Sequence, residues 1–546
     1  MNRYILSIDQ GTTSSRVVLY DDKFKIKNIQ QKEFRQFFPK DGWVEHDAEE
    51  IWNDVKKLIQ LTIKKNKLKP NQIASIGITN QRETTVLWNK ITGKPLYKAI
   101  VWQDRRTAEY CEKLKTQNKD KIIQKITGLV LDPYFSATKI KWILNKVSNK
   151  KKRSNKNILF GTIDTWLLWK LTEGKSHFTD ITNASRTMLY DSRKEEWSKE
   201  LLALFKIDKN ILFGTIDSWL LWKLTEGKSH FTDITNASRT MLYDSRKEEW
   251  SKELLKLFKI DKKILPEVKE NAYDFGSTKL FGGKIQIGGM AGDQQAATIG
   301  QACFSAGQSK STYGTGCFLL MNIGSKFKLS SNKLLTTVAF KINGKKMFCY
   351  EGSIFVAGSA IQWLRDNMMF FKNSKETDKL YSLANENENV IVIPALTGLG
   401  APHWQPNTRG AIFGLTRNTS QADIIKATLD SLSYQTLDLI ESMERDAKIS
   451  ISEIRVDGGM INNNNFLQSL SNVTQVKIIK PENIETTSLG AAYLAGLSAG
   501  IIKNTNDIKK FWKKNKETKP KIKKSIVQKK VATWKKTIKN LIALNN

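Results

Sequence analysis

The sequence predicts an α/β fold built from two similar domains, and three observations support this prediction. Strand patterns alternate with helix patterns along the chain, which is typical of α/β domains. Each half of the chain carries a hairpin pattern with a glycine- and threonine-rich turn. The length of 546 residues allows two or more domains with cores of their own.

The first hairpin pattern lies close to the N-terminus. Apolar runs at Tyr4–Ile8 and Val17–Tyr20 flank the polar turn Gln10–Ser15. Its backbone amides, its hydroxyls and the Arg16 cation can hold a polyphosphate, and Asp9 can hold a hydrated Mg²⁺. The hydroxyl donors are Thr12, Thr13 and Ser14. An ordinary polar hairpin is the alternative interpretation.

The second hairpin pattern covers Ser311–Leu320 and has Thr315 in its turn. Two phosphate-binding hairpins, one in each half of the chain, suggest that two domains close on a nucleotide between them. A P-loop fold is not expected, because Gly174-Lys175-Ser176 has Trp169 where the first glycine of that motif should stand.

Composition narrows the class of protein. A hydrophobic fraction of 40% and a charged fraction of 26% are typical of a soluble globular protein. No apolar run approaches the ~18 residues of a membrane span, and the apolar stretch near Met1 is too short for a signal peptide. The four cysteines lack metal-ligand spacing, which favours reduced thiols and a cytoplasmic location.

The net charge of +34 raises the possibility of a nucleic-acid or anionic-membrane partner. Most of the lysines, however, are spread along the whole chain. Only the tail is one-sided, with fifteen lysines from Lys503 to Lys539. Apolar residues alternate with them, which predicts a docked amphipathic helix with a solvated face. We therefore expect no nucleic-acid partner, since no binding module accompanies the charge.

Residues 157–209 are repeated almost unchanged as residues 210–262. Over this 53-residue tandem duplication only Thr165/Ser218 and Ala203/Lys256 differ. Two copies are too few for a solenoid, so the near-identity indicates a recent duplication or an error in the recorded sequence. A fold with one place for this unit cannot bury both copies there, and the sequence does not decide which copy occupies it. A short amphipathic helix is expected at Leu201–Phe205 or Leu254–Phe258.

Outside the duplication, the patterns predict these strands: Ile73–Thr79, Thr84–Trp88, Ile285–Gly289, Ser311–Met321, Val390–Pro394 and Ile454–Val456. They predict these helices: Arg105–Lys115, Ser136–Val147, Gln421–Lys448 and Ser488–Gly500. The third of these helices is preceded by Ser420, with Asp423 three residues later, a capping-box arrangement.

Three segments offer groups that could hold and activate a polyol. Arg82 and Glu83 follow a strand, and opposite charges there can each bind a hydroxyl. Tyr134 offers a phenol, and Asp293 lies in a Gly-rich turn before a small-residue helix. Each also has a structural explanation: a surface ion pair, a core aromatic residue and a helix cap.

Taken together and in order, these segments resemble the glycerol kinases of the FGGY carbohydrate kinase family. The motif Gly-Ile-Thr-Asn-Gln-Arg-Glu-Thr at residues 77–84 is distinctive, and the resemblance extends from Tyr4 to about Gly500. Further matching stretches are Ser7–Arg16, Gly42–Asp47, Ala99–Arg106, Thr127–Phe135, Gly292–Ala297, Thr312–Phe318, Gly398–Trp404, Gly410–Thr416, Val456–Gly459 and Leu489–Gly496.

The resemblance implies two actin-like (ribonuclease-H-like) domains with ATP and Mg²⁺ in the cleft between them. We expect an N-terminal domain at 4–300, a C-terminal domain at 309–498 and a Lys-rich helical tail at 499–546. The resemblance implies that glycerol is held by Arg82, Glu83, Tyr134, Asp293, Gln294, Trp102 and Phe318. It implies that the nucleotide is held by Thr12, Thr13, Ser14, Arg16, Thr315, Gly358, Gln362, Gly459 and Asn463.

The expected reaction is phosphorylation of glycerol to sn-glycerol 3-phosphate. Asp293 would accept the proton of a terminal hydroxyl during in-line attack on the γ-phosphoryl group, and Asp9 would hold Mg²⁺ through water. Two alternatives stay open: a kinase of the same family acting on another polyol or ketose, and a non-catalytic, nucleic-acid-binding relic. A homo-oligomer is possible.

Overall fold

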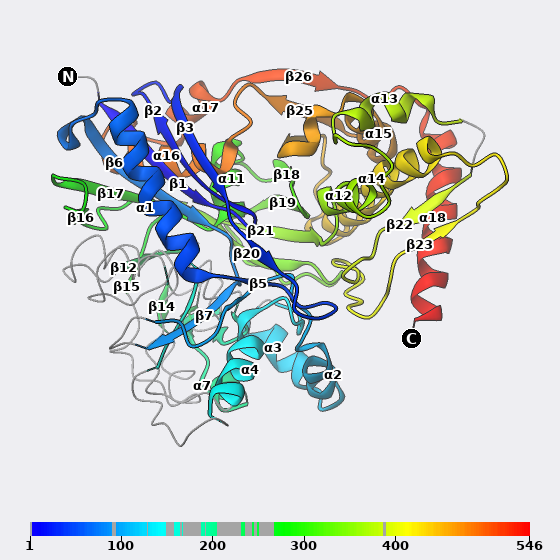
Figure 1. The fold of residues 1–546 in the computed structure, drawn as a ribbon, viewed down its shortest axis with the longest axis horizontal. Coiled ribbons are helices and arrows are strands. Elements are labelled where there is room, and N and C mark those ends of the chain that lie inside the picture. The colour runs from blue at the N-terminus through cyan, green and yellow to red at the C-terminus, as the bar shows by residue number, and fades with distance from the viewer. Residues whose placement is uncertain are drawn as a thin grey trace.

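The computed structural model describes residues 3–89, 94–127, 129–148, 158–163, 166, 187–191, 193–204, 231–234, 243–244, 248–250, 267–385 and 389–545. Its centre is formed by two large sheets, one from each half of the chain (Figure 1). The predicted α/β class is confirmed, since helices pack against both sheets.

The N-terminal sheet has six strands in the order β16-β17-β6-β1-β2-β3. Its strands are β1 Tyr4–Gln10, β2 Ser14–Tyr20, β3 Ile26–Glu33, β6 Ile73–Asn80, β16 Ser277–Thr278 and β17 Ile285–Met290. β1 and β2 form the predicted antiparallel hairpin, while β1 and β6 run parallel. Helix α1 (Ala48–Lys65) packs on β2 and β3, and Asp47 caps its first turn by accepting from the Glu49 and Glu50 amides.

A smaller five-stranded sheet extends this half of the molecule, in the order β4-β5-β8-β7-β9. Its strands are β4 Gln36–Phe37, β5 Glu45–His46, β7 Thr85–Asn89, β8 Ala99–Ile100 and β9 Ile158–Thr162. Helices α2 (Ala108–Thr116), α3 (Lys119–Thr127) and α4 (Ser136–Ser148) lie together at the bottom of Figure 1. The predicted helix Arg105–Lys115 therefore begins three residues late.

Described segments of the duplicated block come from both copies. The first copy supplies β9, β10 (Tyr190–Asp191), β11 (Arg193–Trp197) and α7 (Lys199–Leu204), which is the expected short helix. The second copy supplies β12 (Phe231–Asp233), β13 (Tyr243–Asp244) and β14 (Glu249–Trp250). β11 pairs with β13, so the two copies contact each other. The alternative helix Leu254–Phe258 lies outside the described residues.

Each copy also contributes buried side chains to the rest of the domain. Trp166 of the first copy packs edge-on against Trp88 with ring centroids 5.5 Å apart. Strand β12 of the second copy runs parallel to β15 (Glu267–Lys269), and buried Asp233 accepts a hydrogen bond from Asn271 Nδ2 at 2.5 Å. In the part of the chain that the structure describes, both copies thus contribute to the N-terminal half, the first through β9 beside β7 and the second through β12 beside β15.

The C-terminal sheet has seven strands in the order β20-β21-β19-β18-β24-β25-β26. Its strands are β18 Ser309–Tyr313, β19 Cys317–Gly324, β20 Leu335–Ile342, β21 Lys345–Ile354, β24 Glu453–Asp457, β25 Lys477–Pro481 and β26 Lys514–Thr518. β18 and β19 form the second predicted hairpin. The surrounding elements are α12 Gly358–Asp366, α13 Glu376–Leu383, α14 Gln421–Ala447, α15 Asn464–Thr474 and the pair β22 Ile391–Ile393 and β23 Ala411–Phe413. The predicted capping box of α14 is present, since Ser420 and Asp423 bond each other's backbone amides.

Helices α11 (Asp293–Gly300) and α16 (Thr486–Ser498) cross where the two halves meet, and their backbones touch. A Cβ atom on Gly490 would lie 1.8 Å from the carbonyl oxygen of Ala296. A Cβ atom on Gly300 would lie 1.9 Å from the carbonyl oxygen of Thr486. Only glycine fits at either position. Because Asp293 is the first residue of α11, this crossing lies close to the candidate base.

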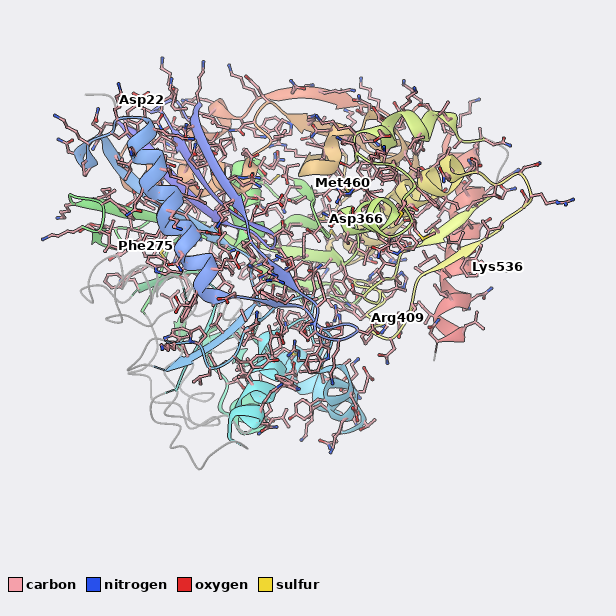
Figure 2. The ribbon with its side chains drawn as sticks, in the orientation of Figure 1. Asp22, Phe275, Asp366, Arg409, Met460 and Lys536 are labelled. Atoms are coloured by element: carbon pink, nitrogen blue, oxygen red, sulfur yellow. The ribbon has the colours of Figure 1, made fainter. Side chains whose placement is uncertain are left out.

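The Lys-rich tail is docked, as predicted, with α18 (Lys524–Leu544) on the C-terminal half and Phe511 against Phe24 of the N-terminal half, but it is not wholly helical. α17 (Thr505–Phe511) is followed by β26 and then by α18. Trp534, Ile538 and Leu541 of α18 are buried, whereas Lys536 is exposed on the same helix (Figure 2). The strand β26 corrects the expectation of an amphipathic helix: it pairs antiparallel with β25, a long-range contact that local periodicity cannot reveal.

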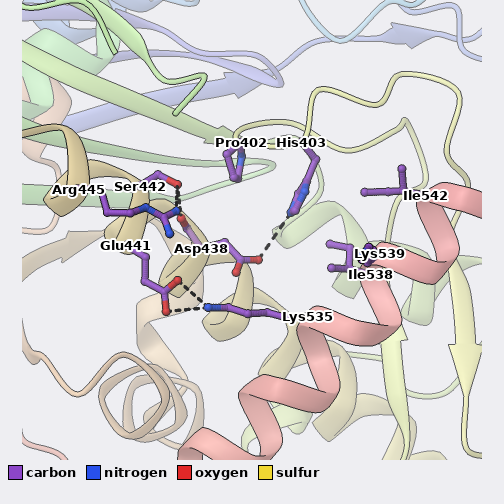
Figure 3. A pocket seen from close by; sticks show the side chains of 10 residues that line it. All are labelled: Pro402, His403, Asp438, Glu441, Ser442, Arg445, Lys535, Ile538, Lys539 and Ile542. Atoms are coloured by element: carbon purple, nitrogen blue, oxygen red, sulfur yellow. Dashed lines mark hydrogen bonds and ion pairs between the residues drawn. The ribbon is translucent and has the colours of Figure 1, made fainter. Parts of the chain in front are cut away.

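A cavity of about 370 Å³ lies between α14, α18 and the loop at Pro402 and His403 (Figure 3). The charges that line it are largely paired: Lys535 contacts Glu441 at 2.6 Å, and Asp438 accepts from Trp534 Nε1 at 3.0 Å. These contacts fix α18 on α14. No described helix has both the length and the apolar character needed to cross a membrane.

Candidate active site

The turns of the two hairpins both lie beside Trp102, and each is stabilised by its own backbone bonds. In the first turn the Gly11 amide donates to the Ser14 carbonyl at 2.9 Å. In the second, the Gly314 amide donates to the Gly316 carbonyl at 3.0 Å, and the Thr315 carbonyl accepts from Ala357 and Ser359. The second turn is thereby joined to the start of α12.

Asp9 lies at the end of β1, directly opposite Arg16 of β2. Burial raises the pKa of the Asp9 carboxyl to about 6; the Arg16 cation opposes this shift, and Asp293 adds to it. Ionising the Asp9 carboxyl is costly because the group is buried and interacts with the Asp293 carboxylate. A bound cation would stabilise its ionised form.

Arg82 is almost fully buried between the two halves. Its Nη1 and Nη2 donate to the two carboxylate oxygens of Glu351 at 3.1 and 3.0 Å, a bidentate pair. Its Nε lies 2.8 Å from Asp293 Oδ1 and 4.0 Å from Glu83 Oε1. Its Nη1 also donates to Gln295 Oε1 at 3.3 Å. The predicted acceptor residues Arg82, Glu83 and Asp293 therefore do lie together.

Asp293 begins α11 and is the most exposed member of this group, with 25% of its side chain accessible. The backbone amide of Gln294 donates to Asp293 Oδ1 at 2.8 Å, and Gln294 Nε2 donates to Oδ2 at 3.0 Å. The carboxylate is thus held in one orientation while part of it stays accessible. Such a group can accept a proton from a bound hydroxyl.

Trp102, Tyr134 and Phe318, three residues that the resemblance assigns to the glycerol site, form one aromatic cluster. Trp102 packs edge-on against both other rings, with centroids 5.6 Å apart in each case. Its Nε1 donates to Thr12 Oγ1 at 3.0 Å, so the cluster also contacts the first hairpin turn. An apolar wall beside a buried charge cluster can accept the carbon side of a polyol.

The remaining residues of the first hairpin make contacts within the protein. Arg16 forms an ion pair with Glu485 and donates from Nε to Gln31 Oε1 at 3.0 Å. Ser14 Oγ accepts from Gln31 Nε2 at 3.1 Å, and the Thr13 carbonyl accepts from the Phe34 amide at 3.2 Å. Arg16 therefore reaches the boundary between the halves already paired with a carboxylate.

A separate cavity of about 720 Å³ opens beside the second hairpin turn. Its lining includes all the remaining residues predicted to bind the nucleotide: Thr315, Gly358, Gln362, Gly459 and Asn463. Met460, labelled in Figure 2, also lines it. Asn463 caps α15 by accepting from the Phe466 amide at 2.8 Å, so its side chain is partly committed to structure.

Two charged residues beside Gln294 and Arg82 were not predicted from the sequence: Lys310 on β18 and Glu351 on β21. Both side chains are fully buried, Lys310 beside Gln294 and Glu351 against Arg82. The only sequence signal is a single charged residue within each strand pattern, Ser-Lys-Ser-Thr-Tyr and Phe-Cys-Tyr-Glu-Gly. A solvated strand face produces the same signal.

The side chains near Asp9 could hold a magnesium ion only together with the phosphate oxygens of a bound nucleotide. Among the residues that the structure describes, no three His, Cys, Asp or Glu side chains gather as a metal site. Mg²⁺ commonly binds through one or two carboxylates, water and substrate phosphates. Asp9 beside a phosphate-binding turn meets that requirement.

The chain matches two protein-family descriptions over most of its length. The N-terminal domain of the FGGY family of carbohydrate kinases matches residues 4–213 and 210–300, the second match starting where the second copy starts. The C-terminal domain of the same family matches residues 310–499.

Individual relatives agree with this assignment. The chain is 45% identical to a glycerol kinase of Bacillus cereus strain Q1, covering 98% of this chain and 99% of the relative. It is 48% identical to a glycerol kinase of Pediococcus pentosaceus, covering 95% and 94%. Among solved structures, Plasmodium falciparum glycerol kinase with ADP matches with a TM-score of 0.77 and 34% identity, covering 99% of this chain and 98% of that one. The two family descriptions together cover nearly all of the sequence, and Arg82 joins Asp293 of one half to Glu351 of the other. This chain is therefore a kinase belonging to the FGGY family of carbohydrate kinases.

Proposed function

We propose that the protein transfers the γ-phosphoryl group of ATP to a terminal hydroxyl of glycerol, giving sn-glycerol 3-phosphate. The observation that carries this proposal is the group of Arg82, Glu83 and Asp293 beside an aromatic wall, at the boundary between the two hairpin-bearing halves. Relatives named glycerol kinase, 44–48% identical over nearly the whole chain, support the choice of substrate.

On the acceptor side, Arg82, Glu83, Tyr134 and Gln294 bind the hydroxyls of glycerol, and Trp102 and Phe318 contact its carbon atoms. Asp293 accepts the proton of the attacking hydroxyl, because an alcohol is a poor nucleophile while it keeps that proton. Its side chain is 25% accessible, and contacts from Gln294 and Arg82 hold both oxygens in place.

On the donor side, the two hairpin turns bind the phosphates of ATP through backbone amides and hydroxyls. Thr12, Thr13, Ser14 and Arg16 act from the first turn, and Thr315 from the second. The cavity lined by Gly358, Gln362, Gly459 and Asn463 holds the nucleoside. Mg²⁺ held by Asp9 would neutralise charge on the phosphoryl oxygens.

We also propose that the chain divides into an N-terminal domain at 4–300, a C-terminal domain at 309–498 and a tail at 499–546. We further propose a cytoplasmic location, in agreement with four free, buried cysteines. Assembly as a homo-oligomer stays a prediction.

The test is a glycerol-dependent ADP-release assay on protein whose length is verified by intact mass. ADP release with glycerol, ATP and magnesium is the expected result, with little release when a ketose such as xylulose or another polyol replaces glycerol. No nucleotide consumption with glycerol would reject the proposal, and preferential turnover of another polyol or ketose would reassign the substrate.

A further inference from the structure

Two buried charged residues of the C-terminal half contact the residues that hold Asp293. Asp293, Gln294 and Arg82 lie within the segment matched by the N-terminal family domain, and Lys310 and Glu351 lie within the C-terminal one. We propose that Lys310 and Glu351 are positioning residues, which orient the Asp293 carboxylate through Gln294 and Arg82. This inference rests on the proposed function, since it gives these two residues a part in the same phosphoryl transfer.

The first connection runs from Lys310 through Gln294. Lys310 Nζ donates to Gln294 Oε1 and, at 2.9 Å, to Thr312 Oγ1. An ammonium group has no acceptor, so the amide of Gln294 must turn its oxygen toward Lys310. The Nε2 group then points the other way and donates to Asp293 Oδ2 at 3.0 Å. Without Lys310, the side-chain amide of Gln294 would be free to flip and to place its oxygen against the Asp293 carboxylate.

The second connection runs from Glu351 through Arg82. The bidentate pair fixes the plane of the guanidinium, because two parallel hydrogen bonds allow little rotation. With the plane fixed, Nε lies 2.8 Å from Asp293 Oδ1. Glu351 also shares the positive charge of Arg82 with Asp293. Arg82 paired with Asp293 alone would move onto the carboxylate that has to accept the proton.

The burial of both residues argues for a role beyond stability. Lys310 and Glu351 are each 0% exposed, and Arg82 is 2% exposed. Burying charged groups is costly even when they are paired, and apolar replacements often fold as well or better. Within the described part of the chain, no carboxylate lies within 4.0 Å of Lys310 Nζ, so its hydrogen bonds to Gln294 and Thr312 are its close polar contacts.

The decisive experiment is a double-mutant cycle in steady-state kinetics, using Lys310→Met, Gln294→Ala and the double variant of the full chain. If Lys310 acts through Gln294, Lys310→Met lowers kcat about 10- to 100-fold, and the double variant is no slower than Gln294→Ala within twofold. The KM for ATP and the affinity for ADP stay within twofold of wild type. Lys341→Met is the matched control, since this lysine pairs with Glu248 and not with a residue of the candidate site.

Glu351 is tested by Glu351→Gln and Glu351→Asp in the same assay. We expect both to lower kcat at least 10-fold with ADP affinity unchanged, and Glu351→Asp to be partly rescued because it keeps the charge. Equal losses of kcat and ADP affinity would instead indicate a merely structural role. If Glu351→Gln does not fold, the Lys310–Gln294 cycle still decides.

The outcomes separate this inference from the proposed function. Wild-type turnover combined with near-normal Lys310→Met, or with additive effects in the double variant, overturns the positioning role alone. Wild-type protein that binds ADP but does not phosphorylate glycerol overturns the proposed function, and the inference with it.

Discussion

Arg82 Nε lies 2.8 Å from Asp293 Oδ1, so a buried cation from the β6–β7 connection contacts the first residue of α11. The same cation is shared with Glu351 of the other half of the molecule. The carboxylate that is expected to act as base is therefore ordered before any substrate enters. Pre-ordering of this kind lowers the cost of reaching the reactive geometry.

Replacing Asp293 by asparagine tests the base directly. Asp293→Asn should bind glycerol but transfer phosphate ~10²–10⁴-fold more slowly, the usual loss for a general base. Glycerol binding is measured by calorimetry and turnover by ADP release. Asp274→Asn, at an exposed loop position, serves as control. Near-normal turnover of Asp293→Asn would reject the role.

Removing one copy of the duplicated block should leave a folded, active enzyme. In the deletion of residues 210–262, Phe178–Ile181 has the same sequence as Phe231–Ile234 and can supply the strand beside β15. Activity and thermal unfolding are compared with the full chain. Deletion of 157–262, which removes both copies, should abolish folding. A single-copy deletion that fails to fold would show that both copies are needed.

Trp534 should anchor the C-terminal helix. Its ring stacks on Tyr434 with centroids 5.3 Å apart, and its Nε1 donates to Asp438. Trp534→Ala should lower the free energy of unfolding by about 3–5 kcal/mol, as for other buried tryptophans. Lys536→Ala, on the exposed side of α18, should change it by about 0.5 kcal/mol or less. Equal melting temperatures for the two variants would contradict the docking of α18.

His46 should make the protein sensitive to acid. Burial lowers the pKa of His46 from 6.5 to about 3, and its Nε2 lies 2.6 Å from Gln36 Oε1. Between these two pH values the unfolded chain binds the proton and the folded chain does not, so stability falls as the pH decreases through this window. His46→Gln should lose less stability from pH 6.5 to pH 4 than wild type. An NMR titration in which the His46 ring protonates near pH 6.5 would contradict this.

Much of the fold could be predicted from local pattern. The two hairpins, the capping box at Ser420 and the helix around α16 follow from periodicity and turn chemistry, which act over a few residues. The strand β26 could not be predicted in this way. Its lysine-rich sequence has no strand-like alternation, and only its pairing with β25 makes it a strand.

The candidate site, too, could be predicted only in part from the sequence. Arg82, Glu83 and Asp293 stand in distinctive motifs, so they could be named before their proximity was known. Lys310 and Glu351 could not, because a charged residue within a strand pattern usually faces water. Their significance comes from contacts with residues far away in the sequence. The pairing of Arg16 with Glu485 could not be predicted either, because these two residues also lie far apart in the sequence.

The contact of Gly490 with Ala296 has a mechanical consequence. Helix α16 also lies main chain to main chain on the N-terminal sheet, since a Cβ atom on Gly77 would lie 2.2 Å from the carbonyl oxygen of Ala491. Asp293 is three residues before Ala296, ~4.5 Å along the helix axis, so its position depends directly on how closely α11 approaches α16. Any side chain at Gly490 would push the two helices apart and carry the Asp293 carboxylate away from Arg82.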